Sequence, residues 1–212
     1  MDAIPPNAHL YLPVLVAEYK KVWPIFTWPE FLAAQIEQET CISAKSKRCW
    51  NPKTENINPK NNNEYGFGLG QLTKTNKFNA FEEVVAASPD LKSWKWENRF
   101  DAGYQIKALV YMDKKATKSL VDTTEYNKAA FAFSAYNGGL GGVLNDRKYC
   151  KQFTDCDYTK WFGHVETHSH KSKTKLSGYR ISAYEINRDY VRNIMLVRSE
   201  KYKVAIKKLI DK

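Results

Sequence analysis

The sequence lacks the features that mark exported and membrane-bound chains. Its N-terminus, Met-Asp-Ala-Ile-Pro-Pro-Asn, has no basic start and no long apolar run, so we expect no signal peptide. No segment is apolar over the length that a transmembrane helix needs. These absences predict a chain that is made as a soluble cytoplasmic product and leaves the cytoplasm only through some other device.

Motifs for several kinds of ligand are missing as well. The sequence contains no aromatic and basic RNA-binding signature, no paired zinc-finger spacing and no glycine-rich phosphate loop. It therefore indicates no cofactor and no metal ion, and it gives no support to nucleic acid as a partner. Alternation of polar and apolar residues is scarce too, which argues against a fold built mainly from strands.

What the chain does contain is enough for one domain. At 212 residues it can bury a substantial core, and we expect a single globular domain over residues 1–212. Aromatic residues make up 14% of the chain, with 13 Tyr and 6 Trp. That content suits a wet groove lined by rings, and it fits a Tyr-rich core and surface equally well.

The net charge of +10 is unevenly placed. Residues 171–212 hold 12 Lys or Arg against 4 Asp or Glu, which gives +8, whereas the other 170 residues hold 21 against 19, which gives +2. A basic end on a nearly neutral body predicts a polyanionic partner: nucleic acid, an anionic membrane surface or an acidic cell-wall polymer. The amphipathic segment 202–212 is either a surface helix that closes the domain or a point of attraction to an anionic envelope.

The four cysteines form two pairs that are close in sequence, Cys41 with Cys49 and Cys150 with Cys156. Four cysteines allow three connectivities, and proximity favours these two disulfides. Neither spacing matches a Cys-x-x-Cys metal or redox motif. The alternative is four free thiols, as in a reducing cytosol.

Apolar residues at intervals of three and four predict a mainly α fold. The polar stretch 41–64 is expected to be a loop, and residues 65–72 contain too many glycines for a regular element. Besides the helix described next, the expected helices span residues 7–23, 79–87, 98–115, 125–135, 142–148 and 187–210, the last with Tyr190, Ile194, Val197 and Val204 as its apolar positions.

Residues 27–40 predict a short helix of particular interest. Thr27 and Glu30 have the spacing of a capping box, in which each side chain accepts a hydrogen bond from the other residue's backbone. Pro29 suits the first helical turn.

One acid of this helix follows its apolar stripe. At 100° per residue, Leu32, Ile36 and Glu39 fall within a narrow arc, whereas Glu30 and Glu37 lie on the opposite side, where we expect solvent. An acid at the end of an apolar stripe loses water, so its pKa rises and it can donate a proton near neutral pH. The alternative is a solvated Glu39 with nearby basic residues as loose partners.

Four short segments occur in a fixed order: Gln-Glu-Thr at 38–40, Gly-Phe-Gly-Leu-Gly-Gln-Leu at 66–72, Ala-Phe-Ser-Ala-Tyr-Asn-Gly-Gly-Leu-Gly-Gly-Val at 132–143 and Asp-Tyr-Val-Arg-Asn-Ile at 189–194. Together they resemble the soluble lytic transglycosylase family, which shares the goose-type lysozyme fold. The family pattern is Glu-Ser, Gly-Leu-Met-Gln, Ala-Tyr-Asn-x-Gly and a late Tyr-Val. The resemblance implies a lysozyme-like, mainly α domain with a substrate cleft.

Carried over position by position, the resemblance implies roles for five residues. Glu39 matches the family's single catalytic acid, and Gln71 matches the glutamine that lines the sugar groove. Tyr136 and Asn137 match the third motif, where ring and amide hold an N-acetyl sugar. Tyr190 matches the late tyrosine, whose hydroxyl lies near the acid and orients it.

The chain also departs from the family pattern at three places. Thr40 replaces the usual Ser and keeps its hydroxyl, so it stays among the expected substrate-binding residues. Gly70 replaces the usual Met, which opens the groove there. The acid that usually lies four residues before the last tyrosine is Ile186 here, with Glu185 one position away, so that contact is not carried over.

The resemblance implies cleavage of the β-1,4 bond between N-acetylmuramic acid and N-acetylglucosamine. Glu39 would protonate the bridging oxygen, and the substrate's acetamido oxygen would stabilise the oxocarbenium-like centre. Ionised Glu39 would then take a proton from the C6 hydroxyl and close a 1,6-anhydro ring without consuming water.

Hydrolysis of the same bond is the rival reaction, and it needs a second acid that positions water. Glu64 is the best-placed candidate and Glu55 the next, although we expect Glu64 to cap or solvate a loop. A chain that keeps the fold only to bind the cell wall is a further alternative, and a basic nucleic-acid binder is a third.

The segment His164-Val-Glu-Thr-His-Ser-His170 brings three imidazoles and Glu166 close together in sequence. It lacks the helical His-Glu-x-x-His pattern, and we interpret it as a solvated loop rather than a metal site. Trp161 beside it is either a stacking ring for a sugar or a core anchor.

A small, basic enzyme of this kind without a separate wall-binding module resembles a bacteriophage endolysin. That placement implies synthesis in the host cytoplasm, action on peptidoglycan in the periplasm once the membrane is permeabilised, and a monomer whose partners are glycan strands and an anionic envelope surface.

Overall fold

The computed structural model describes residues 3–61, 63–175 and 177–212. The chain divides into two compact units: Met1–Tyr111 with Ile194–Lys212 form unit 1, and Met112–Asn193 form unit 2. A single domain over the whole chain stays a prediction, and each unit has a core of its own. In the described part of the chain, no helix combines the length and the hydropathy needed to span a bilayer.

The described residues are mainly helical, which confirms the predicted fold class at that level. Local signals set several boundaries: Thr124 caps α5 through its side chain, and Gly139, at φ 82°, ends it. Pro13 lies inside the first helix. The helices are α1 (Ala8–Val22), α2 (Pro29–Thr40), α3 (Ala80–Ala87), α4 (Ala102–Thr117), α5 (Glu125–Gly138), α6 (Leu140–Cys150), α7 (Ala183–Arg192) and α8 (Lys203–Ile210).

A three-stranded sheet replaces part of the predicted loop and part of the irregular segment predicted after it. Strands β1 (Glu55–Asn58), β2 (Glu64–Phe67) and β3 (Leu72–Lys74) form an antiparallel sheet in the order β1-β2-β3. The prediction of a loop at 41–64 followed by an irregular segment is therefore wrong for these strands. Each strand is only three or four residues long, so its pairing depends on partners that a single-segment pattern does not reveal.

The two faces of this sheet differ, because successive strand residues point to opposite sides. Phe67 and its partner Leu72 are buried on one face. There Phe67 packs near Phe81 and Trp94, with ring centroids 6.2 and 6.4 Å away. The opposite face carries Gly66 and polar residues, so it is free of this aromatic cluster.

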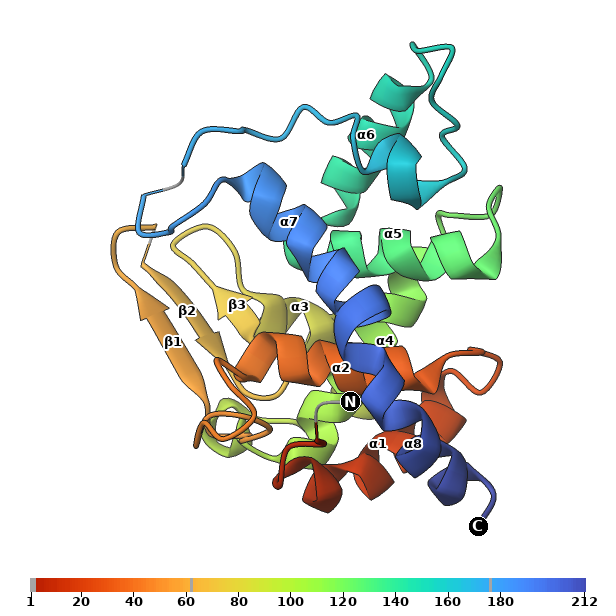
Figure 1. Ribbon diagram of the computed structural model, residues 1–212. Coiled ribbons are helices and arrows are strands. Elements are labelled where there is room, and N and C mark those ends of the chain that lie inside the picture. Colours follow the sequence, from red (N-terminus) through yellow and green to blue (C-terminus); the bar gives the residue numbers. More distant parts are fainter. Residues whose placement is uncertain (1–2, 62, 176) are drawn as a thin grey trace. The chain divides into compact units, whose positions relative to one another are not determined.

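The core of unit 1 is formed where α1, α2 and α8 pack against one another (Figure 1). Leu12 and Leu15 of α1, Leu32 and Ile36 of α2 and Ile206 of α8 are all buried. Helix α2 contacts α1 on one side and the C-terminal turns on another, so it is buried almost all round. This position decides the surroundings of its acids.

The core of unit 2 is formed by α5 with α6 and α7. Phe131 of α5 meets Trp161 edge to face, with ring centroids 5.6 Å apart. Val143 of α6 and Val191 of α7 are fully buried. Trp161 is therefore a core anchor and not a stacking ring for a sugar.

The predicted continuous helix 187–210 is interrupted. After α7 the chain makes a π-helical turn, Asn193–Arg198, and a 3-10 turn, Ser199–Tyr202, before α8 begins. These turns change the helical phase. Val197 and Val204, predicted to face the core, are therefore exposed, at 63% and 66%. Helix α8 packs on α1 and α2, which supports the interpretation of the C-terminus as a helix that closes unit 1.

Candidate active site

Helix α2 starts without the predicted capping box. Its N-cap is Trp28, whose side chain makes no capping hydrogen bond, and Pro29 occupies the first turn as expected. Glu30 is buried rather than solvated, and its carboxylate accepts a hydrogen bond from its own backbone N–H. Burial raises the pKa of Glu30 above its usual value, which that hydrogen bond and Lys203 oppose.

The last turns of α2 carry two acids with different surroundings. Glu39 is half-buried, whereas Glu37 is only 2% exposed. The prediction that Glu37 faces solvent is wrong, because α2 has packing neighbours on more than its apolar side. Glu39 therefore keeps partial access to solvent, as a proton donor to a substrate needs, while Glu37 is enclosed.

Glu37 is held by a network from the C-terminal part of unit 1. Its Oε1 accepts from Arg198 Nη1 at 2.7 Å and from Lys201 Nζ at 2.8 Å. Its Oε2 accepts from the hydroxyl of Tyr202, which in turn accepts from Trp50 Nε1 at 3.0 Å. Burial and the adjacent carboxylate raise the pKa of Tyr202, so its hydroxyl stays protonated and donates to Glu37.

Thr40, next to Glu39, is engaged within the protein. Its hydroxyl donates to the Ile36 carbonyl at 2.7 Å and accepts from the Trp50 N–H at 2.9 Å. The prediction that Thr40 contacts substrate is therefore corrected: its one proton is already used, and the residue fixes the end of α2 to the following segment.

That following segment is braced at both ends. Cys41 is disulfide-bonded to Cys49, and the following residue, Trp50, lies in the left-handed region at φ 53°. Thr54 donates its hydroxyl to the Arg48 carbonyl at 2.7 Å. Strain of this kind persists only where the surroundings determine the backbone, and it is concentrated at functional sites.

Gln71 is tied to the same segment. Its Nε2 donates to the Thr54 carbonyl at 3.2 Å and to the Gly68 carbonyl at 2.8 Å, and its Oε1 accepts from Asn56 Nδ2 at 2.7 Å. Its backbone is also left-handed, at φ 46°. A side chain at Gly66 would approach Gln71 Oε1 to 3.0 Å, so this glycine makes room for the amide.

The two candidate second acids have partners of their own. Glu64 is the first residue of β2, and its Oε2 accepts from Asn61 Nδ2 at 2.7 Å. Glu55 accepts from the hydroxyl of Tyr65, and Arg99 lies 3.8 Å away. Glu64 thus binds the loop before β2, as expected, and Glu55 binds a residue of the neighbouring strand.

Unit 2 brings Tyr136, Asn137 and Tyr190 together. The rings of Tyr136 and Tyr190 are stacked with centroids 6.5 Å apart. Asn137 is exposed, and its Oδ1 accepts from Asn187 Nδ2 at 3.1 Å. Asn187 also donates to the Ser134 carbonyl at 2.9 Å, so the amide of Asn137 is held at a fixed place.

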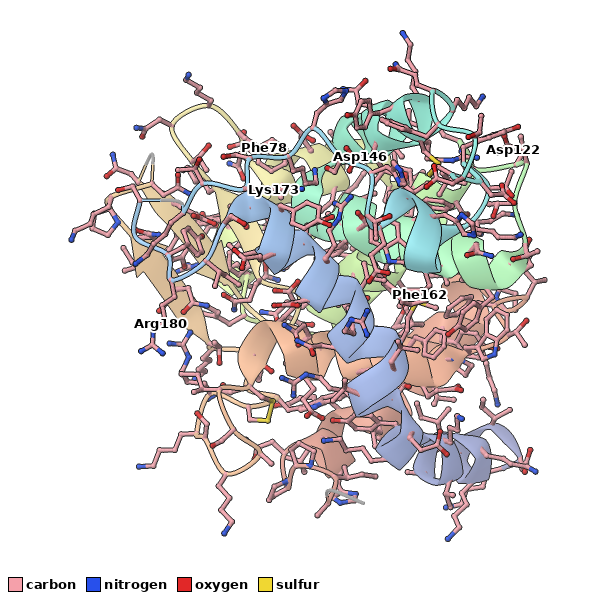
Figure 2. The ribbon with its side chains drawn as sticks, turned by 45° about the horizontal axis from the view of Figure 1, so that its top comes forward. Phe78, Asp122, Asp146, Phe162, Lys173 and Arg180 are labelled. Atoms are coloured by element: carbon pink, nitrogen blue, oxygen red, sulfur yellow. A yellow bond between two sulfur atoms is a disulfide. The ribbon has the colours of Figure 1, made fainter. Side chains whose placement is uncertain are left out.

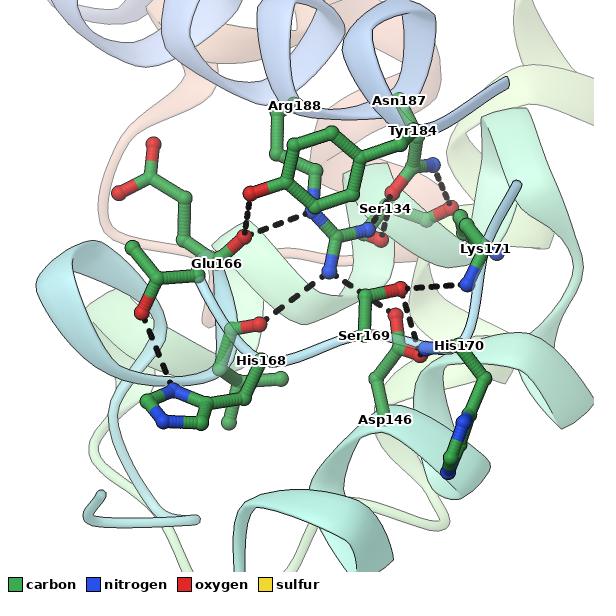
Figure 3. A network of polar contacts seen from close by, with 12 residues as sticks. Ser134, Asp146, Glu166, His168, Ser169, His170, Lys171, Tyr184, Asn187 and Arg188 are labelled. Atoms are coloured by element: carbon green, nitrogen blue, oxygen red, sulfur yellow. Dashed lines mark hydrogen bonds and ion pairs between the residues drawn. The ribbon is translucent and has the colours of Figure 1, made fainter. Parts of the chain in front are cut away.

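Beneath this group lies a buried ion pair (Figure 3). Arg188 Nη2 is 2.9 Å from Asp146 Oδ2, with both side chains almost fully buried. Arg188 Nη1 also donates to Asn187 Oδ1 at 2.8 Å, and its Nε donates to the Glu166 carbonyl at 2.9 Å. The network therefore fixes Asn187, and through it Asn137.

The histidine segment belongs to this framework and is not a solvated loop. Glu166 is buried, and its carboxylate accepts from the Gly163 N–H at 3.1 Å and pairs with Arg192 at 3.1 Å. His164 Nδ1 accepts from the Asp157 N–H at 3.1 Å. Among the described residues, no group of three or more His, Cys, Asp or Glu is arranged to hold a metal ion.

The second disulfide joins Cys150 to Cys156 in unit 2. Cys150 is the last residue of α6, and Arg147 of the same helix pairs at 2.5 Å with Asp122, which is labelled in Figure 2. With Cys41–Cys49 this disulfide makes up the two bridges that short spacing favours, in place of the four free thiols that were the alternative.

The site residues that the sequence predicts are thus arranged in two groups, one in each unit. Unit 1 joins the end of α2 to Gln71, and unit 2 joins the third motif to α7. The residues that hold these groups, Glu37 and Asn187, were not predicted. Arg198, Lys201 and Tyr202 at spacings of three and four are the signal for a buried partner of Glu37. Asn187 lies three residues before Tyr190, on the same helical face.

Comparisons with protein-family models and with curated protein sequences found no match for this chain.

Proposed function

We propose that this protein is a lytic transglycosylase that cleaves peptidoglycan glycan strands between N-acetylmuramic acid and N-acetylglucosamine, with Glu39 as its catalytic acid. The observation that carries the proposal is a series of contacts along one segment of unit 1. Thr40 accepts from the Trp50 N–H, the carbonyl of the next residue, Asn51, accepts from the Thr54 N–H, and the Thr54 carbonyl accepts from Gln71 Nε2. This series holds the residues that match the first two family motifs on one braced frame in unit 1.

The surroundings of Glu39 suit proton donation. The residue is half-buried at the end of a helix in which Pro29–Glu37 and Thr40 are buried, so water is partly excluded while a glycosidic oxygen can still approach. Glu37, by contrast, is committed to two cations and a tyrosine and is closed to substrate. The proton donor of this helix is therefore Glu39.

The reaction needs one carboxyl group. Glu39 protonates the bridging oxygen, the acetamido oxygen of the substrate stabilises the positive centre, and the C6 hydroxyl closes the 1,6-anhydro ring as it returns its proton to Glu39. Asn137, with its Oδ1 turned to Asn187, offers its Nδ2 group to the N-acetyl oxygen of a sugar. The contacts of Glu64 and Glu55 with their own neighbours favour this reaction over hydrolysis, which needs a carboxylate that positions water.

The decisive variant is Glu39→Gln, which keeps the shape of the side chain and removes the transferable proton. We expect the rate of release of soluble fragments from purified sacculi to fall by about 10²–10⁴-fold, while the far-ultraviolet circular dichroism is unchanged. Glu64→Gln is the matched control, and it should keep the rate within a few fold. Lysis by Glu39→Gln at the wild-type rate would remove the proposal.

The reaction type is read from the products by mass spectrometry. Anhydro-muramic ends support the transglycosylase, whereas reducing ends that disappear in Glu64→Gln indicate a muramidase. Binding to sacculi without any cleavage by the wild-type chain indicates a wall-binding protein. If the enzyme is made by a bacteriophage, as an endolysin, its action on sacculi is the same and its role is lysis of the host.

A further inference from the structure

The ammonium group of Lys171 is half-buried in unit 2 without a hydrogen-bond acceptor among the residues that the structure describes. Its backbone N–H donates to Ser169 Oγ at 3.0 Å, but no described carboxylate or carbonyl pairs with Nζ. Burial lowers the pKa of Lys171 below its usual value, because the charged form has lost water and gained no partner that fully replaces it.

The Lys171 ammonium group lies against the glycine-rich turn of the third motif, next to Gly138 and Gly142. A Cβ atom at Gly142 would lie 2.6 Å from Lys171 Nζ, and one at Gly138 would lie 3.1 Å from Nζ and 2.8 Å from Asn187 Nδ2. The glycines therefore let two nitrogen donors approach the same stretch of backbone. This stretch follows directly after the exposed Asn137.

Asp146, the acid that acts electrostatically on Lys171, already has other partners. Asp146 Oδ2 pairs with Arg188, and its Oδ1 accepts from Ser169 Oγ at 2.8 Å and from the His170 N–H at 3.3 Å (Figure 3). Arg188, Asp146 and Lys171 together carry one net positive charge. A partly desolvated cation in such a place favours an anionic ligand.

We propose that Lys171 binds a carboxylate of the muramoyl residue whose N-acetyl group lies at Asn137. The identity of that sugar rests on the proposed function. The two contacts would distinguish muramic acid, which bears a lactyl group, from N-acetylglucosamine, which carries no carboxylate. Lys171 would thus determine which sugar of the alternating strand occupies this place in unit 2.

The carboxylate has two chemical sources. In a strand without peptides it is the lactyl carboxylate itself, whereas in a peptide-bearing strand the lactyl group is an amide and the carboxylates belong to the peptide. N-acetylmuramic acid and N-acetylmuramoyl dipeptide represent these two sources, and N-acetylglucosamine represents neither.

The test is a titration of the full chain with each of the three compounds at low salt, followed by the ¹⁵N side-chain amide signals of Asn137 and Asn187. We expect N-acetylmuramic acid or the dipeptide to bind roughly tenfold more tightly than N-acetylglucosamine. Lys171→Met should abolish that preference and leave binding of N-acetylglucosamine unchanged. Lys173→Met is the control: Lys173 is exposed and lies 5.0 Å from the Tyr184 ring, and its loss should keep the preference (Figure 2).

A thermal melt separates this role from a structural one. Because the charged form of Lys171 is penalised at neutral pH, Lys171→Met should melt at the same temperature as the wild type or higher, whereas a lysine that supports the fold would lower the melting temperature. Equal affinity for all three compounds, or a preference that survives Lys171→Met, overturns the inference. Cleavage of sacculi is measured separately, so failure of the proposed function gives a different result.

Discussion

At Glu37, a single buried carboxylate binds three side chains from the C-terminal part of the chain. Its carboxylate is enclosed between Arg198, Lys201 and the Tyr202 hydroxyl. Buried charges of this kind add little net stability compared with an apolar core, but the loss of one partner leaves the others unpaired. The position two residues before Glu39 means that this network also fixes the turn of α2 that carries the acid.

We expect Glu37→Gln to lower the free energy of unfolding by about 3–5 kcal/mol, because two cations lose their buried partner. Urea denaturation followed by tryptophan fluorescence measures the change. Glu83→Gln, on an exposed face of α3, is the control and should change stability by less than about 0.5 kcal/mol. Equal midpoints for the wild type and Glu37→Gln would show that the network is dispensable.

At the scale of elements, the braced segment between α2 and β1 joins the acid to the sheet. The Cys41–Cys49 bridge lies at its start, and Thr54 at its end accepts from both Gly68 and Gln71. The second bridge, Cys150–Cys156, lies in unit 2 and closes the end of α6.

Replacing both cysteines of either bridge by serine should lower the free energy of unfolding by about 2–3 kcal/mol, the loop-closure value for rings this short. The effects on lysis should differ. Cys41→Ser with Cys49→Ser should slow the release of fragments from sacculi, since Gln71 loses its fixed frame, whereas Cys150→Ser with Cys156→Ser should not. Both rates are measured well below the melting temperatures, and equal rates for the two double variants would argue against the frame.

Patterns within one element predicted the helices well and the sheet badly. Helical periodicity and caps are local, so α1, α3 and α5 begin and end close to their predicted limits. The strands are short, and Gly66 is required only because the Gln71 amide lies over it. The sequence pattern of β2 alone does not indicate the contact between Gly66 and Gln71.

At the scale of the whole molecule, part of the basic excess at the C-terminal end is used internally. Arg188 pairs with Asp146, Arg192 with Glu166, and Arg198 with Glu37. The net charge of +10 still predicts long-range attraction to an anionic wall. We expect that attraction to come from the lysines and arginines that stay exposed.

We expect binding to sacculi to weaken as the salt concentration rises from 0.01 to 0.15 M, because the screening length falls from about 30 to about 8 Å. A pelleting assay with Glu39→Gln measures binding without cleavage. Chitin, an uncharged glycan, is the control and should show little dependence on salt. Binding to sacculi that does not change with salt would exclude a role for the net charge.

Patterns among residues close together in the chain predicted the helical class, favoured the pairing of neighbouring cysteines and indicated the candidate acid. The tertiary structure decided which acid of α2 is enclosed. Glu37 and Glu39 look alike in sequence, and only the arrival of Arg198, Lys201 and Tyr202 from the far end of the chain makes one a buried anchor and leaves the other half-open. The same reason applies to Thr40, whose hydroxyl is used up by Ile36 and Trp50 once the segment folds back on α2.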